Sequence, residues 1–250
     1  MTSSILAAAV AVLSTLSPQV GAPDWQRASQ YYMQGWTALA SDPVDAERDF
    51  QQAITVYPDF PLAHYGLGRS LMAQKRYSEA LRAYLRSQEL FRTQGSDRVA
   101  QQVGLLKRYN SSEVAQAARV TSADTRMTAQ GPSRTTTSTQ MELQNQINML
   151  QQATQQDSRT SVVGAVPGFV SLAVGSAYFR LNQLGDAERE YKRALEGDVK
   201  YGEAHNNLAV VYFLTDRYDA AEQSIKAAEK SGYRVSQGLK DDIKRKKSGG

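Results

Sequence analysis

Apolar residues recur with helical spacing along much of the chain. Residues 168–201 hold two such stripes in succession: Val174, Tyr178, Leu181 and then Ala187, Tyr191, Ala194. Residues at i, i+3, i+4 and i+7 share one face of an α-helix, so each stripe predicts a helix with one buried side. Asn182-Gln183 lies between the stripes and favours a turn, because such residues are common at helix ends. The pattern predicts a helix–turn–helix unit.

This unit recurs with a period of 34 residues. Placing residue 168 on residue 202 aligns Tyr178 with Tyr212 and Ala187 with Ala221. The stretch that begins at residue 61 joins the same frame at a shift of 141. That shift aligns Leu67 with Leu208, and Arg76-Tyr77 with Arg217-Tyr218. A fixed period of this length indicates a stack of repeats rather than one folded core.

A further copy lies upstream, over about 27–60, and is clear only in its second helix. That helix holds Ala46, Phe50 and Ala53 in register with the later copies. The turn Ser41-Asp42-Pro43 in front of it is one or two residues short for the frame. The chain is therefore expected to hold four repeats in two tandem pairs.

The period and the residues at fixed positions resemble the tetratricopeptide repeat (TPR). The copy over 168–201 matches the family pattern at Val174, Gly175, Tyr178, Ala187, Tyr191 and Ala194. It departs from the pattern at Ser171 and Val199, where the family has a bulky residue and a proline. The resemblance implies an all-α, TPR-like α-solenoid, of the type found in secreted or envelope proteins of bacteria. Gly175 and Ala187 are small where the two helices are expected to cross, which lets the backbones approach.

The pattern divides the chain into five segments. These are 1–22, a signal peptide or N-terminal apolar segment; 23–94, the first TPR pair; 95–167, an insert; 168–235, the second pair; and 236–250, a capping helix with a basic tail. Within the last segment, Leu239 and Ile243 are expected to cover the fourth repeat. The basic run over 244–247 is interpreted as a solvated tail. A nucleic-acid site would combine such charge with aromatic residues, and none lies near this run.

The N-terminus carries an unbroken apolar run from Ile5 to Leu13. It is shorter than the about 20 residues that span a bilayer, and it suits the core of a secretory signal. Two features oppose a signal: Pro23 follows the expected cut, and no Lys or Arg precedes the run. The alternative is an Ala-rich helix that caps the solenoid. We expect a secreted, periplasmic or envelope protein that starts near Ala22, with a cytoplasmic one as the alternative, and membrane contact only through this segment.

The insert is expected to combine helices with a linker. Apolar spacing predicts a helix over about 97–109, and a one-sided stripe of Leu143, Ile147 and Leu150 predicts another. Residues 121–140 hold almost nothing to bury, so a flexible, disordered linker is expected there. The insert is close to two repeat lengths, so a degenerate repeat hidden within it stays an open alternative.

Composition excludes several kinds of chemistry. Among 250 residues there is no cysteine, which rules out disulfides and thiolate sites. The formal charge of +4 is too weak to imply nucleic acid. The two histidines, His64 and His205, both occupy position 4 of their repeats, where the family packs a bulky residue. No phosphate-binding loop or nucleophile elbow is present. We therefore expect no enzyme, metal or cofactor; a catalytic site in the insert is disfavoured by its lack of His and Cys.

The resemblance implies a scaffold or adaptor that binds a peptide-like segment of another protein. In this family the first helix of each repeat lines a concave groove, with positions 2, 5, 9 and 12 pointing into it. Those positions, with one neighbour, are Leu62, Tyr65, Arg69, Met72, Phe169, Leu172, Ser176, Phe179, Arg180, Glu203, Asn206, Val210 and Phe213. Tyr65, Arg69 and Arg180 are hard to explain as core residues, whereas Phe179 and Phe213 have packing between repeats as an alternative.

Other functions stay open beside the scaffold. A small-ligand or cell-wall-associated carrier and a non-catalytic subunit of an enzyme complex are the alternatives. One branch of the family grips carboxylate tails with Lys and Asn from the inner helices. Only Asn206 and its neighbour Asn207 come near that pattern here, so such a clamp is not expected.

Overall fold

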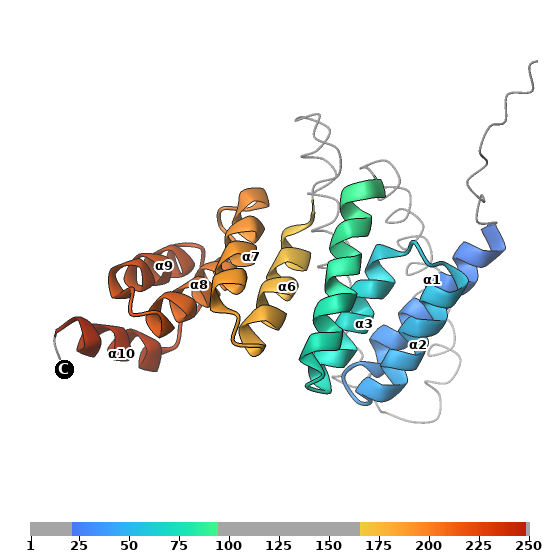
Figure 1. Cartoon of the computed structure of the whole chain (residues 1–250), viewed down its shortest axis with the longest axis horizontal. Helices are drawn as coiled ribbons and strands as arrows, with labels where there is room; N and C mark the ends of the chain where they lie inside the picture. Colours follow the sequence, from blue (N-terminus) through green and yellow to red (C-terminus); the bar gives the residue numbers. More distant parts are fainter. Residues whose placement is uncertain (1–21, 95–165, 249–250) are drawn as a thin grey trace, which may run out of the picture.

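The computed structural model describes residues 22–94 and 166–248, and within them it holds nine helices and no strand. Their bounds are α1 (Ala22–Ala38), α2 (Pro43–Val56), α3 (Pro61–Ala73), an unlabelled helix over 77–94, α6 (Gly168–Arg180), α7 (Leu184–Gly197), α8 (Gly202–Leu214), α9 (Tyr218–Lys230) and α10 (Gln237–Lys247). They follow one another along the long axis of the molecule, from α1 to α10 (Figure 1). The predicted all-α solenoid of helix–turn–helix units is confirmed. The expectations for residues 1–21 and 95–165 lie outside the described residues.

In repeats one to three, the two helices cross at a glycine of the first helix, whereas repeat four has Ala209 at this position. A Cβ atom on Gly68 would lie 2.4 Å from the Tyr84 ring, and one on Gly175 would lie 2.7 Å from the Tyr191 ring. These distances are too short for any side chain, so glycine lets the two helices approach. The expectation that Gly175 and Ala187 permit a close crossing is confirmed, since the same added Cβ lies 3.3 Å from the Ala187 carbonyl oxygen.

The first repeat has the same crossing with a shorter spacing. Gly35 of α1 meets the Phe50 ring of α2, fifteen positions later, whereas Gly68 and Tyr84 are sixteen apart. The turn is thus one residue short, as predicted. Asp42 compensates by capping α2: its Oδ1 accepts hydrogen bonds from the backbone N–H groups of Val44 and Asp45 at 3.0 and 3.1 Å.

The turns inside the other three repeats share one backbone conformation. Lys75, Asn182 and Asp216 adopt φ values of 62°, 60° and 58°, in the left-handed region. Asn and Asp tolerate this region better than most residues, because their short polar side chains bond locally. The turn predicted at Asn182-Gln183 is therefore present, and the fourth repeat has the equivalent turn at Asp216.

Repeats two and three pack directly on each other. The Tyr65 and Phe169 rings meet edge to face with centroids 4.9 Å apart, and Phe91 approaches Phe169 at 6.3 Å. Nearby, Gln88 Nε2 donates a 2.9 Å hydrogen bond to Glu190 Oε2, and each of these two residues is only 4% exposed. The two pairs therefore form a single stack, although 73 residues separate them in the sequence.

α10 ends the stack. Ile243 is buried and Leu239 partly buried against Ala221 and Ile225 of α9 and Ala209 of α8. Around them, charged residues of α10 face water. A polar outer face of this kind prevents further repeats from adding.

Each repeat pair contains an ion pair that joins its two repeats, and these two ion pairs lie at equivalent positions, 141 residues apart in the sequence. Arg76 Nη1 lies 2.7 Å from Glu47 Oε2, and Arg217 Nη2 lies 2.6 Å from Glu188 Oε2. Each pair joins the turn of one repeat to the second helix of the repeat before it. The equal spacing of the two pairs fixes neighbouring repeats in the same register.

The second pair predicts an acid-sensitive contribution to stability. The hydrogen bond from Arg217 lowers the pKa of Glu188 to about 2, from an ordinary 4.5. A depressed carboxyl pKa stabilises the fold above the unfolded pKa and ceases to do so as the pH falls through the folded pKa. We expect the melting temperature to fall between pH 4.5 and 2, and Arg217→Gln to flatten that fall. Equal pH slopes in both proteins would contradict this role.

Candidate functional site

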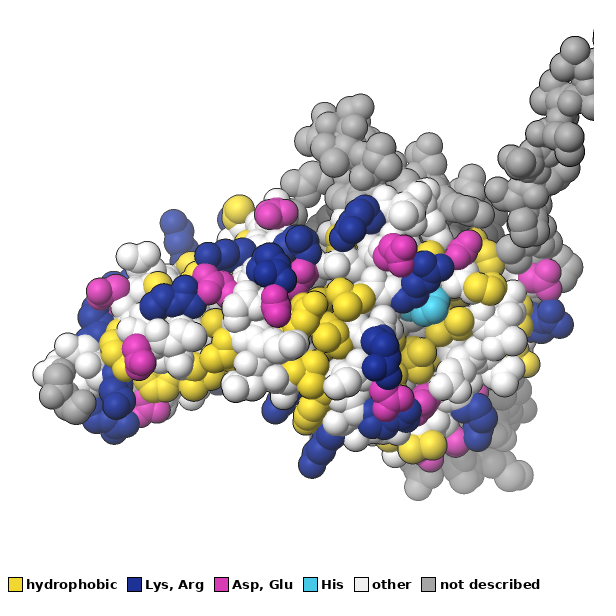
Figure 2. Space-filling model, in the orientation of Figure 1, with side chains coloured by type: hydrophobic (Ala, Val, Ile, Leu, Met, Phe, Trp, Pro, Cys, Tyr) yellow, Lys and Arg dark blue, Asp and Glu magenta, His cyan; other side chains and the backbone are white. Residues whose placement is uncertain are grey.

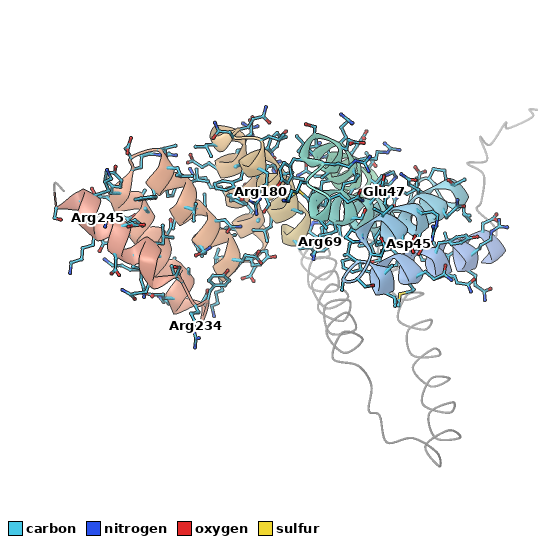
Figure 3. All side chains as sticks on the ribbon, turned by 90° about the horizontal axis from the view of Figure 1, so that it is seen from below. Asp45, Glu47, Arg69, Arg180, Arg234 and Arg245 are labelled. Carbon is cyan, nitrogen blue, oxygen red and sulfur yellow. The ribbon has the colours of Figure 1, made fainter. Side chains whose placement is uncertain are left out.

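The candidate groove residues lie on α3, α6 and α8, the first helices of repeats two to four. α1 belongs to the same row, because its Trp36 ring stacks on Tyr65 of α3 at 6.3 Å and 28°. Tyr65 in turn meets Phe169 of α6. The first helices of repeats one to three are thus linked by a continuous series of rings. Figure 3 labels Arg69 and Arg180 in the middle of this row, where α3 and α6 lie.

Four of the candidate residues are closed to a partner. Leu62, Tyr65, Phe169 and Leu172 are buried, with no more than 7% of any of these residues exposed. Tyr65 is held by three rings, since Tyr84 lies 5.6 Å away in addition to Trp36 and Phe169. The expectation that Tyr65 is not a core residue is wrong. The aromatic side chain fills the joint between the first two repeats and the third.

Arg69 and Met72 occupy the edge of this closed part. The Arg69 guanidinium carbon lies 5.6 Å from the centre of the Trp36 ring, and its Nη1 donates a 3.5 Å hydrogen bond to the Tyr65 hydroxyl. A cation over an aromatic face is attracted by the ring quadrupole. Met72 is half-buried and packs on the core of the first pair. Arg69 therefore has a structural role, whatever else it contacts.

The remaining candidates, on α6 and α8, have accessible side chains; this set is called here the open groove, after the groove positions of the family pattern. Ser176, Phe179, Asn206, Val210 and Phe213 are half-buried, and Arg180 and Glu203 are exposed.

The polar members of the open groove differ in their partners. Ser176 Oγ donates to the Leu172 carbonyl at 2.9 Å. Asn206 Nδ2 donates to its neighbour Asn207 Oδ1 at 3.3 Å. Arg180 forms no ion pair with any residue in the parts of the chain that the structure describes. Its guanidinium and the Asn206 amide are therefore available for hydrogen bonds to a ligand.

The apolar members differ in their packing. Phe213 packs on Tyr218 with ring centroids 6.1 Å apart, and Phe179 borders the core of repeats three and four. Both rings are partly accessible. Packing between repeats and contact with a partner are thus compatible for these two residues.

Two phenols interact electrostatically with Glu203: Tyr191, which belongs to the stripe predicted for the third repeat, and Tyr201, which was not foreseen from the sequence. Burial raises the pKa of Tyr201, and the Glu203 carboxylate raises it further, while Arg69 lowers it. Burial also raises the pKa of Tyr191, with Glu203 again contributing in the same direction. Tyr201 ends its repeat, outside the groove positions of the family pattern, so no spacing rule indicates it.

The histidines have equivalent structural contacts, as their repeat position predicts. His64 Nε2 bonds the Pro58 carbonyl oxygen and His205 Nε2 bonds that of Val199, both at 2.9 Å. Each ring secures the turn that leads into its own helix. In the described ranges no group of three or more His, Cys, Asp or Glu residues is arranged to hold a metal ion. None of the described helices is long and apolar enough to cross a membrane.

Solved structures of repeat proteins resemble the chain at low sequence identity. They include MamA (residues 41 to the end) from Desulfovibrio magneticus RS-1, 14% identical over 82% of this chain and 95% of that one, with a TM-score of 0.29. A thermophilic TPR protein from Thermus thermophilus is 17% identical over 88% of this chain and 99% of its own, with a TM-score of 0.36. YrrB, a TPR protein with an unusual peptide-binding site, is 13% identical over 92% of this chain and 99% of its own, with a TM-score of 0.29.

The family comparison is more specific. No curated protein matches the sequence. The family model described as "Tetratricopeptide repeat" matches residues 32–94 and 172–233, which together make up half of the chain. Both matches fall on the helix pairs described above, with their glycine crossings and repeated turns. The chain belongs to the tetratricopeptide repeat family.

Proposed function

We propose that the protein is a binding scaffold that holds a peptide-like segment of another protein in the open groove over α6 and α8. Tetratricopeptide repeats generally mediate protein–protein interaction, and their inner helices provide an extended concave surface. The proposal rests on one observation: side chains along the row of first helices differ in burial. The leading candidate positions on both α3 and α6 are buried, whereas the later positions on α6 and all four on α8 are accessible.

The chemistry of the open groove favours a particular kind of segment. Phe179, Val210 and Phe213 supply apolar contacts, and aromatic residues are enriched where interfaces gain most of their affinity. Arg180 offers a guanidinium for a carboxylate, and Asn206 offers an amide for a peptide backbone. The segment is therefore one with a large apolar residue next to an acidic or amide side chain. No metal, cofactor or catalytic group enters this function.

The test is selection of peptides from a random displayed library against the whole chain. We expect the selected peptides to carry an aromatic or large aliphatic residue beside Asp or Glu. Phe179→Ala with Arg180→Ala is expected to weaken their binding at least tenfold, or about 1.4 kcal/mol, in fluorescence anisotropy. The loss follows from removing the ring contact and the guanidinium together.

The matched control replaces Tyr233 and Lys200 by alanine. These residues are also exposed, and their replacement removes one ring and one cation that are not among the candidate groove positions. Binding by this control should stay within twofold of the unchanged chain. Peptides that bind both double variants equally well would place the binding surface elsewhere.

A further inference from the structure

A second charged surface lies at the C-terminal end of the stack, apart from the open groove. Residues 218–248 hold eight Lys or Arg and five Asp or Glu, so three of the chain's four net positive charges lie in this stretch. Figure 2 shows Lys and Arg side chains gathered at the end that Figure 1 assigns to α10. Four consecutive cations, residues 244–247, occupy the last turn of α10. The helix dipole stabilises cations there, so the run is compatible with the helix.

Part of this charge is already neutralised. Lys247 Nζ lies 2.7 Å from Asp219 and 2.5 Å from Glu222, and Lys240 Nζ lies 2.9 Å from Glu229. These pairs tie α10 to α9. Hydrogen bonds from Lys226 and Lys247 lower the pKa of Glu222 to about 2, so this carboxylate stays ionised beside its two cations.

The other cations have no such partner. Lys244 and Lys246 of α10 form no ion pair with any residue of 22–94 or 166–248, and both are exposed. Lys230 and Arg234, at the turn between α9 and α10, are exposed and unpaired in the same ranges. Figure 3 shows Arg234 and Arg245 at this end of the molecule. These four exposed cations, two on α10 and two before it, thus face only one carboxylate of this end outside the ion pairs of the described ranges, Asp241.

This charge borders a hollow between α9 and α10. The hollow measures about 540 Å³, and Lys226, Lys244 and Ser248 contribute to its lining. The carboxylates in the lining, Glu222 and Glu229, are those already paired with lysines. A negatively charged segment that entered the hollow would therefore meet excess positive charge.

We propose that α10 and the hollow beside it form a docking surface for an acidic peptide segment of a partner protein. Charge complementarity determines this choice of occupant. An anionic membrane is disfavoured, because a helix that lies on a bilayer presents an apolar face, and Ile243 of α10 is 2% exposed. Single-stranded nucleic acid is disfavoured, because its bases stack on aromatic side chains and α10 has none.

The experiment is an anisotropy titration of the full chain with a fluorescein-labelled peptide of alternating glutamate and serine. We expect saturable binding that weakens as salt is raised, because ions screen exposed charges. Lys244→Glu with Lys246→Glu is expected to reduce the affinity at least tenfold. Lys244→Gln with Lys246→Gln, which perturbs the helix end less, is expected to reduce it at least threefold, with the helical circular dichroism unchanged.

The control is Arg92→Glu with Lys200→Glu, which changes the net charge of the chain equally at exposed positions outside α10. It is expected to reduce the affinity less than twofold. The proposal is overturned if this control loses as much affinity as the α10 variant. It is also overturned if the peptide fails to bind. Binding of phosphatidylserine vesicles or an oligonucleotide through Lys244 and Lys246 would not rescue it in that case. Phe179→Ala with Arg180→Ala should leave this titration unchanged, so the two binding surfaces are tested separately.

Discussion

Tyr65→Ala is expected to lower the free energy of unfolding by about 3–5 kcal/mol, the usual cost of removing a large buried aromatic side chain. Tyr65 is 5% exposed and contacts the rings of Trp36, Tyr84 and Phe169. Those rings come from both sides of the joint between the repeat pairs. Urea unfolding followed by circular dichroism measures the change.

Two variants separate loss of packing from other effects. Tyr65→Phe keeps the ring and loses the 3.5 Å hydrogen bond from Arg69, so it should cost about 1 kcal/mol or less. Tyr233→Ala removes a tyrosine that is 37% exposed and should cost about 0.5 kcal/mol. A Tyr65→Ala protein as stable as the unchanged chain would mean that the ring faces solvent, as the groove positions alone suggest.

The second large effect concerns the helix crossing inside repeat three. Ala187→Leu is expected to destabilise the fold by about 1–3 kcal/mol, because it adds bulk to a filled space. Ala187 is fully buried on α7, opposite the glycine that lets α6 approach. Thermal unfolding measures the shift in the melting temperature.

Gly185→Ala is the matched control on the same helix. Gly185 lies two residues earlier, and an added Cβ atom there meets nothing within 4 Å. Alanine restricts the unfolded chain more than glycine does, so this variant should be neutral or more stable by about 0.4–1 kcal/mol. Equal melting temperatures for Ala187→Leu and the unchanged chain would contradict the assigned repeat frame.

Much of the fold follows from sequence periodicity. The period of 34 places Gly68 against Tyr84 and Gly175 against Tyr191, and the turns fall at Lys75, Asn182 and Asp216. Repeat architectures are predictable in this way because each unit contacts mainly its neighbours. The recurrent ion pairs were also detectable, since Glu47 and Glu188 differ by the same 141 residues as Arg76 and Arg217.

The accessibility of the candidate site was less predictable. Position 5 of a repeat holds Tyr65 in the second copy and Asn206 in the fourth, yet the first is buried and the second half-buried. The difference arises from what lies next to each residue. Tyr65 is enclosed by rings from three other helices, including Phe169, which lies far away in the sequence. A repeat position states the direction of a side chain and does not state which neighbours cover it.

The joint between the pairs illustrates the same limit of sequence patterns. The repeat pattern does not indicate how the two pairs pack on each other. The contacts of Phe169 and the buried Gln88–Glu190 hydrogen bond join the pairs into one stack. Sequence distance alone did not indicate that residues 88 and 190 meet, because neither residue type is typical of a buried joint.

Site-specific photo-crosslinking in cells of the native organism tests whether a partner protein binds in the open groove. A photoreactive benzoylphenylalanine in place of Phe213 reports on the open groove, one in place of Glu196 on the exposed side of α7, and one at Gln130 on the insert. If the groove binds the partner, we expect a defined protein adduct at position 213 that Arg180→Ala diminishes. No matching adduct is expected at position 196. The same adduct at position 130 or 196, with none at 213, would contradict this expectation.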